Sequence, residues 1–323
     1  MYVFDEKSIR EYVKTDDKIL SVIEEGFSKL ANGEVTLPPI MRIDIPENNG
    51  EVDVKTAYIK GFDKFAIKIS SGFFNNSQKG LQSLSGMMIL LSAETGFPQA
   101  IFQDNGYLTD VRTGIAGAIA AKYLAKSSID TVGVIGTGTQ ARYQVLALSH
   151  VREFREVIVY GRSESKAKEY AAEIEELLGV TVTCTNSIEE VIRGSEVVIS
   201  TTPSTAPLIK AEWLHPGLHI TAVGSDAEHK QELDPKVFDF AHLICCDVKA
   251  QCVRLGELHH AVDAEVVRLD QENLIELGQL TTGLKKGRTS DHEITICDLT
   301  GTGVQDTAIA LYAYKKLTAK NLV

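Results

Sequence analysis

The chain has 323 residues, which is enough for two domains with a large hydrophobic core. Hydrophobic residues make up 44% of it and charged residues 24%, the balance of an ordinary globular protein. Its net charge of −11 argues against nucleic acid as a partner, and no apolar run reaches membrane-spanning length, although a local cationic pocket could still bind an anionic substrate.

The first 128 residues predict a mixed α+β domain. A helical pattern covers Ser8–Leu30, and short β-like runs follow it, joined by turns rich in Pro, Gly and Asn. These runs are Val52–Tyr58, Phe65–Ser70, Met87–Ser92 and Ala100–Gln103. A helix over Asp110–Leu124 then leads into the rest of the chain.

The most informative segment is TVGVIGTGTQA, residues 131–141. It predicts a buried strand, a tight glycine turn and the start of a helix. Gly136 permits the turn, Gly138 lets a phosphate approach the backbone, and Ala141 permits close packing of helix on strand. The helix N-terminus adds amide donors and a positive dipole end. The segment indicates a dinucleotide site, with a purely structural glycine turn as the alternative.

Strand and helix patterns alternate from Ile129 onward. The strand-like runs are Val132–Ile135, Val157–Tyr160, Val180–Cys184, Val197–Ser200, His219–Val223, Leu243–Cys246 and Ile294–Cys297. A helical pattern between the second and third runs ends at Gly179, and a capping box from Ser187 to Glu190 opens a short helix that stops at Gly194. The alternation predicts a doubly wound α/β domain of the Rossmann type over residues 129–303.

The last helix is predicted over Val304–Leu317, after the final strand. We expect it to pack back on the first domain. The substrate-binding and dimerisation domain would then consist of residues 1–128 completed by residues 304–323, so that both ends of the chain build it.

The end of the second strand bears on the choice of dinucleotide. A site for NAD usually places Asp or Glu there, on the adenosine ribose. Here the strand ends Tyr160-Gly-Arg162-Ser163, without an acid. Arg162 and Ser163 could hold a 2′-phosphate, which favours NADPH, or Arg162 could be a solvated loop residue that leaves both cofactors open.

Two further strand ends should face the cofactor, because ligands lie beyond the carboxyl ends of parallel strands. One carries Thr201, Thr202 and Ser204, whose hydroxyls suit phosphate, ribose or a ring amide, but which would equally form a plain polar turn. The other carries Asp226 just past a buried strand. A carboxyl partly removed from water beside a nicotinamide ring would suit proton transfer, and a helix N-cap is the alternative.

The first domain holds cations in apolar settings. They are Arg42 after two prolines, Lys55, Lys68 in FAIKIS and Arg112 in DVRTG. A strand lysine between two isoleucines more often extends its ammonium to solvent than takes part in catalysis. Several such cations in one half of an acidic chain nevertheless suggest a pocket for a carboxylate.

Other motifs carry less information. The pair His259-His260 has no HExxH pattern and no matching acid, so we expect a surface or helix-start position and no metal site. No GxSxG motif supports a hydrolase. The five cysteines form no CxxC motif, and Cys184, Cys245, Cys246 and Cys297 are predicted as buried free thiols. With a charged N-terminus that lacks a signal-peptide core, this predicts a cytoplasmic location.

Together these residues resemble the ornithine cyclodeaminase/μ-crystallin family over nearly the whole chain. The resemblance rests on ordered motifs: PPIMR ending at Arg42, the Lys68 strand, Arg112-Thr113, GTGTQA, TTPS, VGSDAEHKQELD and Gly301-Thr-Gly303-Val-Gln-Asp306. It implies an NAD(P)-dependent and usually dimeric enzyme that acts on small amino or imino acids.

The resemblance also implies roles for individual residues. Arg42, Lys68 and Arg112 would bind the substrate carboxylate, Gly301 would border the substrate, and Asp226 would be the general acid/base, with Lys68 beside it in catalysis. The expected cofactor contacts are Arg112, Gly136, Gly138, Thr139, Gln140, Arg162, Ser163, Thr201, Thr202, Gly224, Ser225, Lys230 and Thr300.

One departure from the family pattern points to the substrate. Many members have a Met-Pro pair after a short acidic strand, where this chain reads EVDVKT, with Asp53 at the position of a cyclodeaminase glutamate. Lys55 adds a cation where an apolar residue is common, which suits a second substrate carboxylate and not an ornithine ammonium. The segments GFFNN and ELHHA resemble the branch found with ectoine breakdown and the hydroxyaspartate route, which includes iminosuccinate reductases.

The main hypothesis is therefore an imine reductase that forms L-aspartate from iminosuccinate and NAD(P)H. Arg42, Lys68 and Arg112 would hold the α-carboxylate and Lys55 the distal one, while Asp226 supplies a proton to nitrogen. An ornithine cyclodeaminase, which makes proline and ammonia with the same residues, is the enzymatic rival. A cofactor-binding protein without activity, as in crystallin relatives, is the third possibility.

Overall fold

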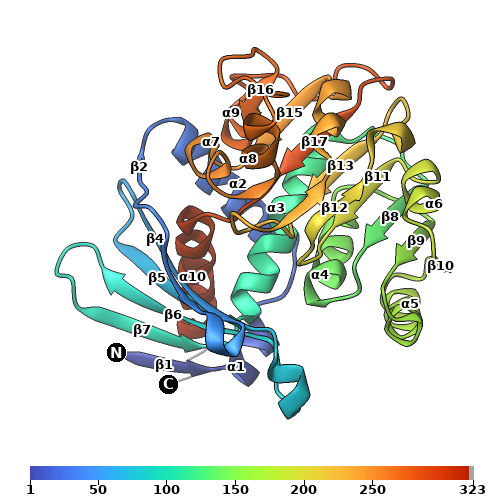
Figure 1. Ribbon diagram of the computed structural model, residues 1–323. Coiled ribbons are helices and arrows are strands. Elements are labelled where there is room, and N and C mark those ends of the chain that lie inside the picture. The colour runs from blue at the N-terminus through green and yellow to red at the C-terminus, as the bar shows by residue number, and fades with distance from the viewer. Residues whose placement is uncertain (320–323) are drawn as a thin grey trace. The chain divides into compact units, whose positions relative to one another are not determined.

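The computed structural model describes residues 1–319, in which the chain divides into two compact units (Figure 1). The first unit comprises Met1–Arg112 and the C-terminal segment that begins at Thr302, and the second comprises Thr113–Gly301. The first boundary falls inside helix α3, Tyr107–Leu124, and so lies nearer the N-terminus than the expected boundary after residue 128. Because α3 is one continuous helix, no break in the sequence pattern marks the boundary between the two units.

The first unit is built on a seven-stranded sheet with the order β1-β7-β6-β5-β4-β2, in which β3 also pairs with β4. Only the β1–β7 pair is parallel. The strands are β1 Tyr2–Asp5, β2 Val35–Thr36, β3 Met41–Ile45, β4 Gly50–Ile59, β5 Lys64–Phe73, β6 Leu84–Ser92 and β7 Pro98–Gln103. Side chains alternate along β4 between buried and half-buried positions, so that one face of the sheet forms the core.

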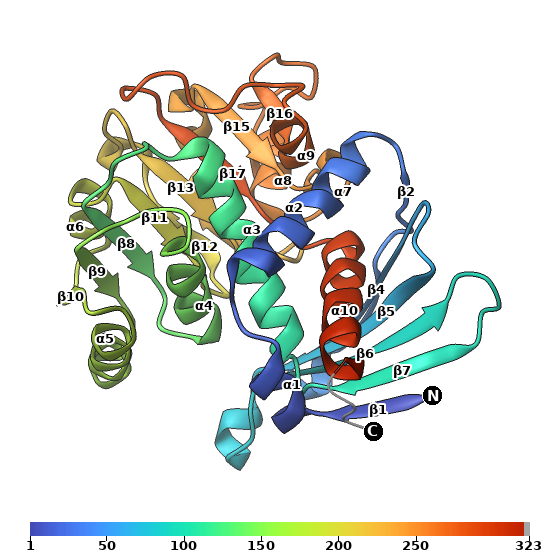
Figure 2. The ribbon, with the colours of Figure 1, turned by 180° about the vertical axis from the view of Figure 1, so that it is seen from behind.

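Helices cover that buried face. They are α1 Glu6–Tyr12, α2 Asp17–Ala31 and α10 Gly303–Thr318, with short 3₁₀ turns at Pro46–Asn48 and Asn76–Lys79 (Figure 2). α10 packs on α2, β4 and β5, and Thr307 fixes it to both strands by accepting from the Ala66 amide and donating to the Ala57 carbonyl. The expected single helix over Ser8–Leu30 is wrong, because Asp16 caps a new helix by accepting from the Ile19 amide.

The second unit contains an eight-stranded, wholly parallel sheet with the order β10-β9-β8-β11-β13-β17-β15-β16. Its strands are β8 Thr131–Ile135, β9 Glu156–Tyr160, β10 Thr181–Thr185, β11 Val197–Ser200, β13 His219–Ala222, β15 Leu243–Cys246, β16 Leu274–Glu276 and β17 Thr295–Asp298. β12, Thr205–Ile209, and β14, Gln231–Leu233, form a separate parallel pair. The chain runs outward from β8 to β10 and then returns to β11 on the other side of β8, so the strand order reverses between β8 and β11.

Helices connect these strands. They are α4 Thr139–Leu148, α5 Glu164–Leu178, α6 Ile188–Arg193, α7 Lys249–Cys252, α8 Gly256–Asp263 and α9 Leu277–Thr281, with 3₁₀ turns at Ala211–Trp213 and Pro235–Phe240. Gly179 ends α5 in a left-handed conformation, as predicted. Ser187 caps α6, but the Glu190 carboxylate accepts from Thr185 and so does not complete the predicted capping box. The α/β fold class is confirmed.

Two further expectations concern cysteines and the membrane. All five cysteines are free thiols, but the prediction that Cys184 is buried is wrong: it is exposed, because β10 is an edge strand. Cys245, Cys246 and Cys297 are buried as predicted. Among the helices of residues 1–319, none is long and apolar enough to cross a membrane.

Candidate functional site

The glycine turn lies where the strand order of the parallel sheet reverses. Gly136 has a φ of +114°, and a Cβ on it would lie 2.8 Å from the Thr201 hydroxyl oxygen. Glycine is therefore required both by the backbone angle and by the close approach of the loop after β11. The reversal point, beyond the carboxyl ends of the strands, is where open α/β sheets bind ligands.

The start of α4 offers backbone amides to such a ligand. α4 begins at Thr139 and Gln140, with Gly138 as N-cap and no side-chain cap, and a Cβ on Gly138 would meet open space. The first amides of a helix lack intrahelical acceptors and lie at its positive end, so they suit an anionic phosphate. The residues present thus fit the diphosphate of a dinucleotide.

Arg142 holds this turn, and the sequence analysis missed it. Its guanidinium donates to the Thr137 carbonyl at 2.7 Å and the Gly138 carbonyl at 3.1 Å, and it pairs with Glu173 on α5. The signal was an arginine in the first turn of the helix that the glycine motif opens. At the end of β9, Arg162 is exposed, whereas the Ser163 hydroxyl caps α5.

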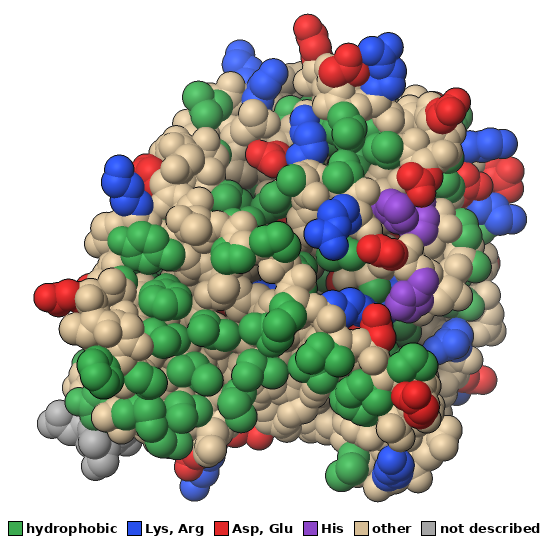
Figure 3. All heavy atoms as spheres, turned by 60° about the vertical axis from the view of Figure 1, so that its left-hand side comes forward, with side chains coloured by type: hydrophobic (Ala, Val, Ile, Leu, Met, Phe, Trp, Pro, Cys, Tyr) green, Lys and Arg blue, Asp and Glu red, His purple; other side chains and the backbone are tan. Residues whose placement is uncertain are grey.

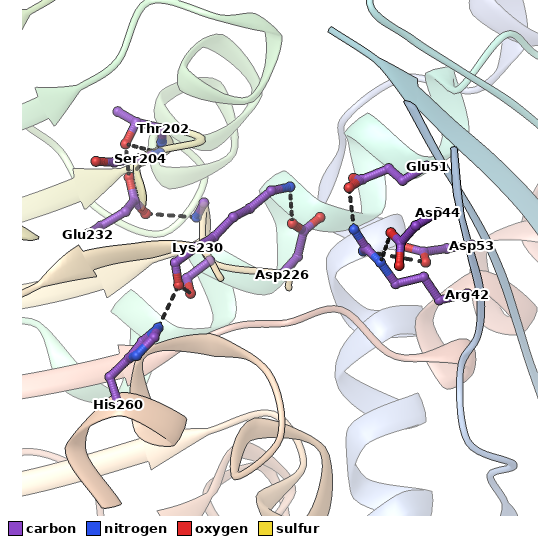
Figure 4. A network of polar contacts seen from close by, with 12 residues as sticks. Arg42, Asp44, Glu51, Asp53, Thr202, Ser204, Asp226, Lys230, Glu232 and His260 are labelled. Carbon is purple, nitrogen blue, oxygen red and sulfur yellow. Dashed lines mark hydrogen bonds and ion pairs between the residues drawn. The ribbon is translucent and has the colours of Figure 1, made fainter. Parts of the chain in front are cut away.

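The loops after β11 and β13 meet at a buried glutamate, Glu232, to which no role was assigned from the sequence. Its carboxylate accepts from Ser200, Thr202 and Gly224. The Thr202 hydroxyl, expected at the cofactor, therefore donates to Glu232 in this structure (Figure 4). A Cβ on Gly224 would overlap the Thr202 backbone, so the two loops touch.

Asp226 lies in a turn and not at a helix start, so the N-cap interpretation is wrong. Its carboxylate is 2.6 Å from the Lys230 ammonium, and its side chain remains 39% exposed (Figure 4). Ser225 donates to the Lys230 carbonyl at 2.5 Å, and His260 on α8 contacts the same oxygen at 2.8 Å. The turn that carries Asp226 is therefore held at both ends. His259 is also on α8, and within residues 1–319 no group of three or more potential ligands could hold a metal ion.

The segment after β17 is fixed by another buried acid of the second unit. Asp247 accepts from the Thr300 hydroxyl at 3.0 Å and the Gly301 amide at 2.6 Å. Gly301 has a φ of +78°, which favours glycine at this bend. Asp247 therefore fixes the positions of Thr300 and Gly301.

In the first unit, the predicted cations converge on one carboxylate. The Lys68 ammonium is 3.1 Å from Asp306, and Arg112 Nε is 2.9 Å from the other carboxylate oxygen. Arg112 also donates to Gln305 at 2.9 Å. Lys55 is directly opposite Lys68 in the β4–β5 pair and acts electrostatically on Asp306. The expectation that Lys68 reaches solvent is wrong, because its side chain is 1% exposed.

Burial and neighbouring charges shift the titration of this cluster. Burial, followed by the charge of Arg112, lowers the pKa of Lys68 from 10.5 to about 7, although Asp306 opposes the change. Burial alone would raise the pKa of Asp306, but Arg112 and Lys68 outweigh it and lower the pKa below its usual value. Burial and the neighbouring positive charges therefore disfavour the ammonium form of Lys68, and a bound anion would stabilise that form.

This shift predicts a pH dependence of stability that Lys68→Met should remove. Between pH 7 and 10.5 the unfolded chain binds more protons at Lys68 than the folded chain, so the folded state gains stability as the pH rises. The gain is complete above pH 10.5 and is lost progressively as the pH falls from 10.5 to 7, below which Lys68 is protonated in both states. Relative to the variant, the wild type should gain up to about 1.4 kcal/mol per pH unit in this window. Urea unfolding of both proteins at several pH values between about 7 and 10 measures it, and parallel dependences of the unfolding free energy on pH would contradict it.

Arg42 does not join this cluster. It pairs with Glu51 and with Asp44 at 2.9 Å, and Asp53 lies 3.7 Å away (Figure 4). β3 and β4 form an antiparallel pair that places Arg42 directly opposite Asp53. The guanidinium expected at the substrate carboxylate is therefore surrounded by the protein's own carboxylates.

Comparisons with known proteins agree with the motifs. The chain is 49% identical over 319 residues to a provisionally named dehydrogenase of Rhizobium meliloti, covering 99% of this chain and 96% of that protein. It is 45% identical over 317 residues to an uncharacterised cyclodeaminase of Sinorhizobium fredii, with 98% and 96% covered. An iminosuccinate reductase of Paracoccus denitrificans is 33% identical over 317 residues, with 96% and 94% covered.

Solved structures share the whole fold. An archaeal alanine dehydrogenase dimer with bound NAD has a TM-score of 0.92 and 35% identity, with 99% of this chain and 97% of that chain covered. A Δ¹-pyrroline-2-carboxylate reductase of Thermococcus litoralis, in complex with NADH and L-proline, has a TM-score of 0.94 and 28% identity, with 99% and 98% covered. A model of the ornithine cyclodeaminase/mu-crystallin family matches residues 3–321. As the motifs predicted, this chain belongs to the ornithine cyclodeaminase/mu-crystallin family.

Proposed function

We propose that this protein is an NAD(P)H-dependent imine reductase that converts iminosuccinate to L-aspartate. The observation that carries the proposal is the buried cluster of Lys55, Lys68 and Arg112 around Asp306. Three buried cations gathered at one place favour an anionic ligand, and two lysines directly opposite each other favour one with two carboxylates. The dehydrogenases and reductases among the relatives support the reaction type.

The dinucleotide, when bound, would supply the hydride that reduces the imine carbon. The amides at the start of α4 would hold its diphosphate, and the loops after β11 and β13 would border the rest. The exposed Arg162 at the end of β9 supports a preference for NADPH. The two solved relatives described above hold NAD or NADH, so both cofactors belong in the assay.

Asp226 would deliver the proton that the imine nitrogen takes up. One imine, one reduced cofactor and one proton then give one amine and one oxidised cofactor. The Lys230 ammonium, 2.6 Å from the carboxylate, fixes the position of Asp226 in the turn that follows β13. Positioning of two charged reactants would be the main contribution of the protein to the rate.

A turnover assay tests the proposal. Oxaloacetate with ammonia, which form iminosuccinate in solution, should give L-aspartate and one equivalent of oxidised cofactor, with NADH or NADPH. Production of proline from ornithine with catalytic NAD would instead establish a cyclodeaminase, the name of the Sinorhizobium relative. Tight cofactor binding without turnover of either substrate would establish a binding protein.

Lys55→Met should change the substrate preference. Loss of one charge-assisted contact should lower kcat/KM for the dicarboxylate imine by roughly 10- to 100-fold. The monocarboxylate imine formed from pyruvate and ammonia should change by no more than about 3-fold, because it has no distal carboxylate. Lys64→Met, at the start of the same strand β5 as Lys68, is the matched control. An equal loss on both imines would remove the case for a four-carbon diacid.

We further propose that the first unit carries the substrate and a dimer interface. The face of its sheet opposite α10 presents apolar side chains in register across five strands (Figure 3). One row consists of Val3, Ile101, Ile89 and Ile67 and ends at the polar Thr56, and the next row is Met41, Val54, Ile69 and Met87. Such an extended apolar face marks an interaction site, and the solved alanine dehydrogenase with 35% identity is a dimer.

Ile67→Asp tests the interface. A carboxylate in the middle of the apolar row should be left desolvated in a dimer, so light scattering should give the mass of a dimer for the wild type and of a monomer for the variant. Leu177→Asp, an exposed leucine on α5 in the other unit, should remain dimeric. A monomeric wild type, or a dimeric Ile67→Asp variant, would contradict the proposal.

A further inference from the structure

We propose that Glu232 is a positioning residue of the cofactor site, which fixes the loop after β11 against the loop after β13. The inference rests on the proposed dinucleotide function, and it extends that function to a buried acid that would not touch the cofactor itself. β11 and β13 are neighbouring parallel strands, and ligands bind beyond the carboxyl ends of such strands. The relative position of the two loops that follow them therefore shapes that part of the site.

Each oxygen of the Glu232 carboxylate holds one loop (Figure 4). Oε1 accepts from the Ser200 hydroxyl at 2.6 Å and from the Thr202 amide and hydroxyl at 2.6 and 2.7 Å. Oε2 accepts from the Gly224 amide at 2.8 Å. The first oxygen thus orders the loop that begins at Thr201, and the second orders the loop that leads to Asp226.

This pattern requires a carboxylate. Glu232 is fully buried, and the four donors named above are all neutral. Burial raises the pKa of Glu232, and the hydrogen bonds oppose that rise. A glutamine has one acceptor oxygen only, so it could hold one loop but would direct an amide against a donor of the other.

The backbone of Glu232 is itself anchored by a second buried glutamate. Glu257 on α8 accepts from the Glu232 amide at 2.7 Å and from the Leu233 amide at 3.0 Å. The carboxylate of Glu232 therefore extends from a fixed strand, β14, toward two loops that have little regular structure. A rigid support of this kind is what keeps binding groups in place.

The experiment compares Glu232→Gln with Glu196→Gln. Glu196 also accepts from two backbone amides, those of Asp130 and Thr131. These amides lie at the start of β8, and therefore at the amino ends of the strands, opposite the ends where ligands bind. Titration of protein fluorescence with NADH and NADPH should show a dissociation constant raised roughly 10-fold in Glu232→Gln and changed by less than about 2-fold in Glu196→Gln. Hydrogen exchange should quicken at the Thr202 or Gly224 amide of Glu232→Gln while core amides of β8 and β11 keep their protection.

Steady-state kinetics distinguish a positioning role of Glu232 from general destabilisation of the protein. Glu232→Gln should raise KM for the cofactor and lower kcat, because Asp226 follows Gly224 closely, with KM for the imine unchanged. Equal losses of cofactor affinity in the two variants, faster exchange throughout the sheet, or unchanged affinity in Glu232→Gln would overturn the inference. Another outcome is that the wild type reduces no iminosuccinate while Glu232→Gln still binds NADH more weakly than the wild type does. That result would support the positioning role of Glu232 and would overturn only the proposed substrate. A wild type that binds neither dinucleotide would overturn both.

Discussion

Replacing Asp226 with Asn should lower kcat for imine reduction by about 10²- to 10⁴-fold, the usual contribution of a general acid. Asn keeps the size of the side chain and removes the proton that the imine nitrogen needs. The dissociation constant for NADH should change by no more than about 3-fold, since the Ser225 and His260 contacts that hold the turn do not involve the carboxylate. Steady-state kinetics and fluorescence titration of the same preparation measure the two quantities.

Asp234→Asn is the matched control for this prediction. Asp234 lies eight positions further along and caps the 3₁₀ turn at Pro235–Phe240, so its replacement should leave kcat within about 2-fold. If Asp226→Asn retains wild-type kcat, or loses activity only by losing the cofactor, Asp226 is not the proton donor. Loss of the decline of kcat on the alkaline limb, where the wild-type acid would be deprotonated, would further support the assignment.

Asp306→Asn should destabilise the protein by about 3–5 kcal/mol, the usual effect of removing one partner of a buried ion pair. Asp306 is the carboxylate shared by Lys68 and Arg112, all three side chains are buried, and Lys55 adds to the positive field. Without it, these cations would face one another in a setting of low dielectric. Urea unfolding at neutral pH measures the loss, which should exceed that of any exposed ion pair.

Two variants make this prediction specific. Adding Lys68→Met to Asp306→Asn removes one of the cations left behind, so part of the stability should return. Asp270→Asn breaks the exposed pair with Arg268 and should destabilise the protein far less, because solvent screens that pair. If Asp306→Asn is no more damaging than Asp270→Asn, the cluster is not held together by that carboxylate.

The parallel sheet of the second unit could be predicted from sequence almost strand by strand. Its central strands are buried on both faces and therefore read as uninterrupted apolar runs, such as Val197–Ser200. β14 and β16, with three residues each, carry too short a pattern to recognise. In the first unit β1 and β3 escaped prediction for a similar reason, since both are short and lie at the margins of their sheet.

The candidate site was predictable where backbone chemistry dictates the residue type. Gly136 is such a position, because a left-handed turn pressed against Thr201 admits only glycine. The partners of charged side chains were not predictable. Lys68 and Asp306 are far apart in the sequence, and a single acid in the first turn of an otherwise apolar helix was the available signal.

Arg42 is a second case in which the partners of a charged side chain could not be predicted. Its sequence setting suggested a substrate contact, but the pairing of β3 with β4 brings Glu51 and Asp53 to it. The role of Glu232 could not be predicted, because an acid buried between two loops produces no periodic pattern in the sequence. Both cases depend on contacts that only the folded chain defines.

Deuterium transfer from the cofactor would distinguish an imine reductase from its rivals. The protein is incubated with oxaloacetate, ammonia and NADH or NADPH that carries deuterium at the transferable position of the nicotinamide, and the amino acid product is analysed by mass spectrometry. An iminosuccinate reductase should give L-aspartate that contains one deuterium, bonded to Cα, for each cofactor oxidised. Aspartate without deuterium, or no aspartate together with proline formed from ornithine, would overturn the proposed function.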